Sequence, residues 1–182
     1  MVNMYESKLT WLQQGIIRLL FVKSGMSLNQ RRIAKMLNVS QPAVRKALPL
    51  LEKKGFIKLK QDKESKRWAI ELNRDNHQVA GLKCADNLKQ IYEVGLAKFL
   101  WESFPGCTVI LFGSYSRGED ITTSDIDIAI IGSKEKEINL TKFDKLLERE
   151  IIINFYSSFK EIHKHLRDSI LNGILLSGSI DL

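Results

Sequence analysis

The sequence predicts an α+β/α/β chain of two parts, and three observations lead to that expectation. Apolar residues recur at helical spacing three times within the first 54 residues, and two short alternating runs follow them. Beyond residue 105, apolar runs of strand length alternate with helical segments, which is typical of an α/β domain. The chain has 182 residues, 44% of them hydrophobic, so it can bury the cores of two small domains.

Charge divides the chain at a similar place. Residues 1–72 hold 15 Lys and Arg against 5 Asp and Glu, a formal charge of +10, whereas residues 73–182 hold 13 against 16, a charge of −3. A basic part joined to a mildly acidic part indicates that the two have different partners. The basic part is a candidate for binding nucleic acid, and a solvated lysine-rich surface is the alternative.

Nothing in the sequence indicates export or a membrane. The apolar run over 16–22 is short and interrupted by Arg18, and no segment reaches the length of a membrane-spanning helix. The two cysteines, Cys84 and Cys107, are isolated and lack the spacing of metal ligands, which favours small buried residues in a reducing compartment. We therefore expect a cytoplasmic protein that makes no membrane contact.

The first part contains signals for three helices and a hairpin. Ser40 is a good N-cap for the third helix, Pro42 suits its first turn, and Gly55 suits its end. The expected elements are helices over 9–23, 29–37 and 41–54 and strands over 56–60 and 67–72. Three helices followed by a two-stranded ribbon form the winged helix-turn-helix pattern, and residues 9–72 resemble many prokaryotic winged-helix regulators.

In a helix-turn-helix, the residues at the start of the second helix of the motif meet base edges in the major groove. Gln41 has the side chain to read adenine, and Arg45 has the side chain to read guanine or to grip phosphate. The candidate DNA-binding residues are Ser40, Gln41, Ala43, Arg45, Lys46 and, on the wing, Arg67. Double-stranded DNA is the expected partner of a domain over 1–74, and a winged helix that contacts only proteins is the alternative.

The second part begins after a polar hinge over 73–76. A long helix is expected over about 77–103, within a linking segment over 75–104, and Pro105 and Gly106 end it. Its apolar face has two possible partners, the rest of the chain or a second copy in a homodimer. The elements expected beyond it are strands over 107–112, 126–131 and 150–156 and helices from 114, over 140–148 and over 159–171.

The stretch FGSYSRGEDITTSDIDIAI, residues 112–130, has the residues for phosphate and metal chemistry. Side chains alternate along a strand, so Asp125 and Asp127 share a face with their Cα atoms about 6.6 Å apart. Mg²⁺ takes one or two carboxylates together with substrate phosphates. Gly113 and Ser114 stand where a strand turns into a helix, and backbone N–H groups there favour phosphate. The alternative is a Gly-Ser turn beside an acidic strand end at the surface.

The segment GSYSRGEDITTSDID resembles the signature of the minimal nucleotidyltransferases of the DNA-polymerase-β-like superfamily, which is Gly-Ser, ten residues and Asp-x-Asp. The resemblance covers about residues 88–180 and implies a nucleotidyltransferase domain with a mixed sheet over 105–182. It implies that Gly113 and Ser114 hold the triphosphate of ATP or another NTP, and that Asp125 and Asp127 hold Mg²⁺ or Mn²⁺. Arg117 would touch phosphate or the acceptor, unless it is simply a solvated arginine.

One position departs from the family pattern. The family usually has a third carboxylate on a later central strand, and by position that carboxylate aligns with Ile152, which can neither bind metal nor accept a proton. Glu150 lies on the same strand face and would substitute only if the strand slips or bends. His163 and His165 are expected at the surface.

Two functions therefore compete. In the first, the chain transfers a nucleotide, AMP from ATP, to a hydroxyl acceptor, and the resemblance favours an antitoxin that modifies a toxin or another protein. In the second, it is a DNA-binding regulator whose nucleotidyltransferase domain is catalytically degenerate, and binds nucleotide or only scaffolds a dimer. The intact Gly-Ser and Asp-x-Asp residues favour the first function, and Ile152 favours the second.

Overall fold

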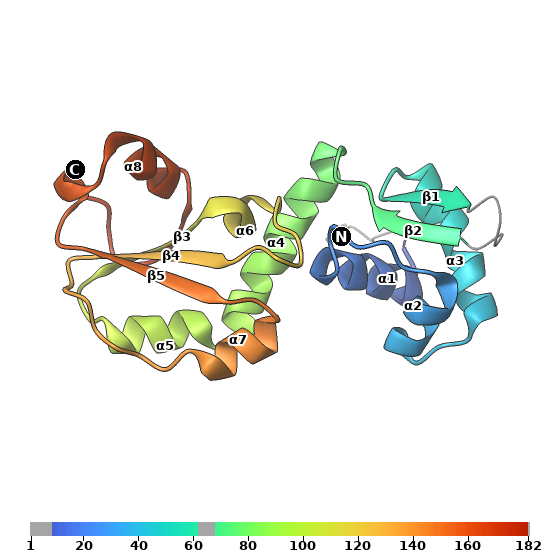
Figure 1. The fold of residues 1–182 in the computed structure, drawn as a ribbon, viewed down its shortest axis with the longest axis horizontal. Helices are drawn as coiled ribbons and strands as arrows, with labels where there is room; N and C mark the ends of the chain where they lie inside the picture. Colours follow the sequence, from blue (N-terminus) through green and yellow to red (C-terminus); the bar gives the residue numbers. More distant parts are fainter. Residues whose placement is uncertain (1–8, 62–67, 182) are drawn as a thin grey trace, which may run out of the picture. The chain divides into compact units, whose positions relative to one another are not determined.

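The structure is a computed structural model that describes residues 9–61 and 68–181 (Figure 1). The chain divides into two compact units, Met1–Val79 and Ala80–Leu182, which we call unit 1 and unit 2. The core residues separate in the same way, because one apolar cluster belongs to unit 1 and two belong to unit 2.

In its described residues, unit 1 contains three helices and an antiparallel pair of strands. Its elements are α1 (Trp11–Val22), α2 (Gln30–Leu37), α3 (Gln41–Lys53), β1 (Ile57–Gln61) and β2 (Trp68–Leu72). A single antiparallel bridge between Leu28 and Ile70 attaches the segment before α2 to this ribbon. The winged helix-turn-helix predicted from the sequence is confirmed in the described residues, and the tip of its hairpin lies outside them.

Short polar residues fix where the unit 1 helices begin. Thr10 caps α1 in a capping box with Gln13, and the Asn29 side chain accepts a hydrogen bond from the Arg32 N–H at the start of α2. Asn38 ends α2 in the left-handed conformation, with a φ of 53°, so the chain turns sharply into α3. Helix α3 then buries one face in the core, with Val44, Ala47, Leu48 and Leu51, and leaves the other face exposed.

Unit 2 is built on a four-stranded mixed sheet. Its helices are α4 (His77–Glu93, which begins in the last residues of unit 1), α5 (Leu96–Ser103), α6 (Gly113–Arg117), α7 (Thr141–Leu147), the 3₁₀ helix η1 (Phe159–Glu161) and α8 (Lys164–Leu171). Its strands are β3 (Thr108–Phe112), β4 (Ile126–Ile131), β5 (Ile151–Tyr156) and β6 (Ile174–Ser177), in the order β5-β4-β3-β6. β3 runs antiparallel to both neighbours, and β4 and β5 are parallel. The predicted mixed sheet is confirmed.

The single long helix expected over 77–103 was wrong. The chain breaks into α4 and α5 at Gly95, whose φ of 81° lies in the left-handed region that glycine adopts without a steric cost. Tyr92, in the last turn of α4, is 54% exposed. The structure also splits the last expected helix into η1 and α8, and it adds β6, which was not predicted.

The two faces of the unit 2 sheet have separate cores. On one face, residues of α5 and α7 pack with Ile126, Ile128 and Ile130 of β4. On the other face, η1 and α8 pack with Ala129 and Ile131. Figure 1 shows α5 and α7 below the strands and α8 above them. Because side chains alternate along β4, Asp127 lies on the face that α8 covers, near the end of the strand where this cover stops.

No helix within the described residues is both long enough and apolar enough to pass through a membrane.

Candidate functional site

The acidic end of β4 carries the two predicted carboxylates. Asp127 pairs in register with Phe112 on β3 and with Ile152 on β5, and it is half-buried. Asp125 precedes the strand and is exposed. Ile126, Ile128 and Ile130 are buried on the opposite face, which fixes the register of the strand because a slip by one residue would bury the acids instead.

Gly113 brings the start of α6 against this acidic end. It follows β3 directly and has a φ of 75°. A Cβ at this position would lie 2.3 Å from the Asp127 Oδ2, so only glycine fits between the strand and the carboxylate. The Ser116 hydroxyl donates to the Gly113 carbonyl at 2.8 Å, which closes the turn. The predicted Gly-Ser turn therefore lies against one of the two predicted acids, Asp127.

The electrostatics of this end favour a cation. Burial raises the pKa of the Asp127 carboxyl, the neighbouring Asp125 raises it further, and the positive charge of Arg117 opposes both effects. Arg117 itself is exposed and forms an ion pair with Glu119, with 2.8 Å between its Nε and the carboxylate. A divalent cation beside Asp125 and Asp127 would relieve the repulsion between them.

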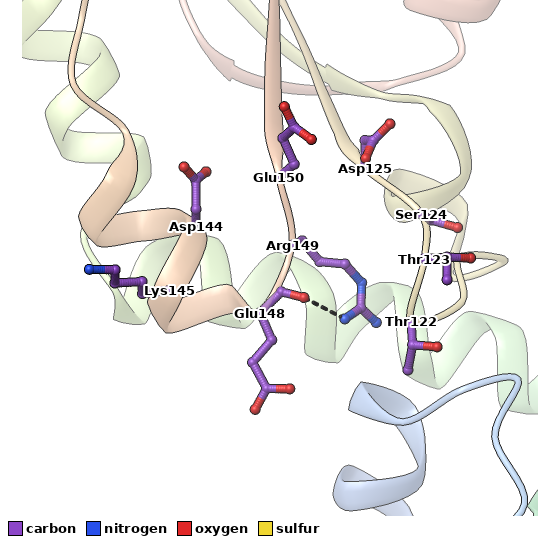
Figure 2. Close-up of a pocket in the computed structure, with 9 residues that line it drawn as sticks. All are labelled: Thr122, Thr123, Ser124, Asp125, Asp144, Lys145, Glu148, Arg149 and Glu150. Carbon is purple, nitrogen blue, oxygen red and sulfur yellow. Dashed lines mark hydrogen bonds between the residues drawn. The ribbon is translucent and has the colours of Figure 1, made fainter.

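Strand β5 brings Ile152, the residue that the sequence interpretation aligned with the third carboxylate of the family, beside Asp127. Ile152 is the in-register partner of Asp127 on β5 and lies on the same sheet face. The Ile126 N–H donates to the Glu150 carbonyl at 2.8 Å, so Glu150 lies across from Asp125, one step from Ile152 along the face. Figure 2 shows the Asp125 and Glu150 side chains pointing to the same side from neighbouring strands.

In the part of the chain that the structure describes, no group of three or more His, Cys, Asp or Glu side chains lies close enough to hold a metal. A seat made of Asp125 and Asp127 fits an ion that also takes oxygens from a bound phosphate, as Mg²⁺ does. The donor set therefore fits a metal that arrives with a nucleotide.

A pocket of about 430 Å³ adjoins Asp125 and was not predicted (Figure 2). Its lining residues are Thr122, Thr123, Ser124, Asp125, Asp144, Lys145, Glu148, Arg149 and Glu150. Asp144 accepts a hydrogen bond from the Ile151 N–H at 3.1 Å, and Arg149 donates to the Glu148 carbonyl at 2.9 Å. No local pattern indicates this pocket, because its two sides come from segments about 20 residues apart in the chain.

The candidate DNA-binding residues of unit 1 lie at the start of α3. The Ser40 hydroxyl accepts a hydrogen bond from the Ala43 N–H at 3.3 Å, so it caps the helix, and Ala43 is half-buried. The exposed side chains at this helix start are Ser40, Gln41, Arg45 and Lys46. Arg67 lies outside the described residues. The contacts of these residues with DNA stay a prediction.

Known protein families match parts of both units. Residues 9–68 match the family model of the MarR family, and residues 95–176 match the family model of the nucleotidyltransferase domain. No curated protein matches the chain.

Among solved structures, the chain is similar to the adhesin competence repressor AdcR from Streptococcus pyogenes, with 25% sequence identity over 56% of this chain and 71% of that chain and a TM-score of 0.42. It is also similar to S. aureus MepR in a DNA complex, with 25% identity over 52% and 81% of the two chains and a TM-score of 0.38. A third similar structure is a mutant of Lactococcus lactis ZitR, with 22% identity over 54% and 64% and a TM-score of 0.40.

Proposed function

We propose that this chain, which joins a winged-helix domain of the MarR family to a nucleotidyltransferase domain, transfers a nucleotide, AMP from Mg-ATP, to a hydroxyl acceptor and releases pyrophosphate. In this proposal, residues 105–182 carry the transfer and residues 1–74 bind double-stranded DNA. The two activities belong to parts of the chain with opposite net charge.

The observation that carries the proposal is the contact between Gly113 and Asp127. A turn whose backbone favours phosphate is useful for transfer only if the phosphate meets the metal seat. The 2.3 Å that would separate a Cβ at Gly113 from the Asp127 carboxylate supports such a meeting, because it leaves the turn and the acid adjacent with no side chain between them.

Each residue then has a distinct task. The Gly113 and Ser114 backbone binds the triphosphate, and Arg117, whose charge reaches Asp127, orients a phosphate or the acceptor. Asp125 and Asp127 would hold Mg²⁺ or Mn²⁺, which neutralises charge on the phosphates when bound. The pocket beside Asp125 provides room for the acceptor hydroxyl group.

The second candidate function is a DNA-binding regulator whose nucleotidyltransferase domain binds nucleotide without transferring it. The pairing of Ile152 with Asp127 favours this function, because an isoleucine there removes a carboxylate that would accept the proton of the attacking hydroxyl. Loss of a general base typically slows a reaction by about 10²–10⁴-fold. Under the first function, Glu150 would substitute for this carboxylate if β5 slips or bends.

The acceptor that we favour is a hydroxyl on a partner protein, as in an antitoxin that modifies its toxin. A basic DNA-binding domain on the same chain suits a protein that also controls its own gene. A toxin-like gene beside the gene for this chain would support this role.

Transfer from ATP labelled at the α-phosphate tests the proposal. We expect label on an acceptor, or on the protein itself, with Mg²⁺ present, and we expect the Asp125→Asn and Asp127→Asn double variant to lose it. Exposed Asp168→Asn is the matched control and should keep it. If the wild type binds Mg-ATP but transfers no label, and Ile152→Asp gains transfer, the second candidate function is correct.

A further inference from the structure

A buried carboxylate outside the acidic end of β4 connects three segments of unit 2. Asp120 follows α6 and is 1% exposed. Its Oδ1 forms an ion pair with the Lys83 ammonium and accepts a hydrogen bond from the Asn87 side chain at 2.8 Å, and both partners belong to α4. Its Oδ2 lies 3.5 Å from an Arg149 guanidinium nitrogen, just before β5. One carboxylate therefore binds α4, the segment between α6 and β4, and the start of β5.

Further contacts attach α6 to α4 at the same place. The Asn87 side chain donates to the Tyr115 carbonyl at 2.9 Å, and the Cys84 thiol donates to the Ser116 carbonyl at 2.9 Å. Gly118 ends α6 with a φ of 70°, and a Cβ there would lie 2.2 Å from the Ala80 carbonyl oxygen. No side chain can separate the two helices, so α4 holds the C-terminal end of α6 in one position.

The segments that Asp120 connects are those that carry the proposed site. α6 begins with Gly113 and Ser114, the segment after Asp120 leads to Asp125, and Arg149 precedes Glu150 directly. None of the paired groups lines the acidic end itself, apart from Arg149 in the adjoining pocket. The cluster is therefore placed to set the distance between the Gly-Ser turn and the carboxylates without touching a ligand.

Stability alone explains this cluster poorly. Burying an ion pair costs desolvation energy, and well-packed apolar residues of the same volume often stabilise a fold as much or more. What an apolar replacement cannot do is fix direction, because hydrogen bonds and ion pairs hold their partners at defined atoms whereas apolar contacts allow sliding. The network joins backbone carbonyls and side chains at defined atoms in all three segments.

We propose that Asp120 is a positioning residue, whose buried contacts with Lys83, Asn87 and Arg149 hold the Gly-Ser turn and the start of β5 at a fixed place relative to Asp125. The proposal rests on the proposed function, because it is the Mg-nucleotide site that is positioned. Asp120 acts through the backbone segments it anchors and makes no contact with substrate.

The test compares Asp120→Asn and Lys83→Met with Phe104→Leu in the full chain. Asp120→Asn keeps the shape of the side chain and removes its charge, and Lys83→Met leaves Arg149 and Asn87 on Asp120, so it is the variant to use if Asp120→Asn does not fold. Phe104 is buried in the same unit against Phe155, so its truncation is a control for loss of stability alone. Amide hydrogen exchange and Mg-ATP affinity are measured well below every melting temperature.

We expect the amides of residues 113–119 and 149–152 to exchange at least tenfold faster in the Asp120 and Lys83 variants than in Phe104→Leu. We also expect Mg-ATP affinity to fall at least tenfold in those two variants while Phe104→Leu keeps it. Equal exchange in all three variants would overturn the proposal, as would an unchanged Mg-ATP affinity in a variant with faster exchange. If the wild type binds no Mg-ATP, the proposed function fails, and the exchange rates still decide whether Asp120 holds the three segments.

Discussion

Asp120 and Asp127 stand seven residues apart in the sequence, and the fold treats their carboxylates in opposite ways. Asp120 is buried with cationic and amide partners from the protein itself. Asp127 is half-buried beside a second carboxylate, and burial and that neighbour raise its pKa. A carboxylate that the protein neutralises itself serves the architecture, whereas one left beside a like charge is arranged for a ligand.

We expect the greatest loss of stability from removal of the Asp120 carboxylate. Replacing Asp120 with alanine leaves Lys83 and Arg149 buried without their shared carboxylate, and removal of one partner of a buried pair typically costs about 3–5 kcal/mol. Urea denaturation of the full chain measures this loss. Lys83→Met should cost clearly less, because Asp120 keeps Arg149 and Asn87. A loss below about 1 kcal/mol for Asp120→Ala would contradict the structural role.

A smaller loss of stability is expected from a substitution at Gly113, in the turn beside Asp127. Gly113→Ala places a methyl group against the Asp127 carboxylate and puts alanine in the left-handed region, which together should destabilise unit 2 by about 2–4 kcal/mol. Gly81→Ala is the matched control, since no atom lies within 4 Å of its Cβ position and helix propensity favours alanine by about 1 kcal/mol. Similar urea midpoints for the two variants would mean that the turn is looser than described.

Basic side chains differ in the same way as the two aspartates, and a DNA-binding experiment tests this difference. Arg149 is buried with protein partners, whereas Arg45 and Lys46 are exposed at the start of α3. The Arg45→Ala and Lys46→Ala double variant should bind duplex DNA about tenfold to a hundredfold more weakly. The slope of the logarithm of its binding constant against the logarithm of the salt concentration should be smaller in magnitude by about one to two. Lys134→Ala with Lys136→Ala is the control, and equal weakening of both variants in a gel-shift titration would reject the assignment of the recognition helix.

Substitution of Asp127 should have a small effect on stability, and this effect should be a gain at neutral pH. Because its pKa is raised in the folded chain, its contribution to stability is complete below the unfolded value of about 4 and is lost as pH rises through the folded pKa. Asp127→Asn should therefore raise the melting temperature slightly at pH 7 in chelator and change it little at acidic pH. The gain should stay within about 1 kcal/mol, because solvent screens a partly exposed group. A destabilised variant at pH 7 would show that Asp127 has a partner within the protein.

Local patterns made the ligand side of the comparison predictable. Gly113, Ser114, Asp125 and Asp127 lie within 15 residues, and strand alternation together with a strand-to-helix turn was enough to predict that they form one site. The caps of unit 1 were predictable for the same reason, because Ser40 acts on the residues that follow it directly. The break at Gly95 was missed, because a single glycine within a helical pattern does not by itself end a helix.

The contacts of buried Asp120 could not be predicted, because the residues that it contacts are distant in the sequence. Asp120 lies 37 residues from Lys83 and 33 from Asn87, and nothing near it indicates burial. The sequence of α4 contains one signal. Lys83 and Asn87 lie on the same helix face as buried Val79 and buried Ile91, because these positions are four residues apart. Two polar residues on an apolar stripe indicate a buried polar cluster, although they do not identify its carboxylate.

Mn²⁺ binding measured by electron paramagnetic resonance tests most directly whether Asp125 and Asp127 hold the metal of a bound nucleotide. In the full chain we expect weak Mn²⁺ binding alone and at least tenfold tighter binding with ATP present, because the seat is completed by phosphate oxygens. The Asp125→Asn and Asp127→Asn double variant should lose the nucleotide-dependent binding, whereas Asp168→Asn should keep it. Equal Mn-ATP binding by the double variant and the wild type would contradict the account.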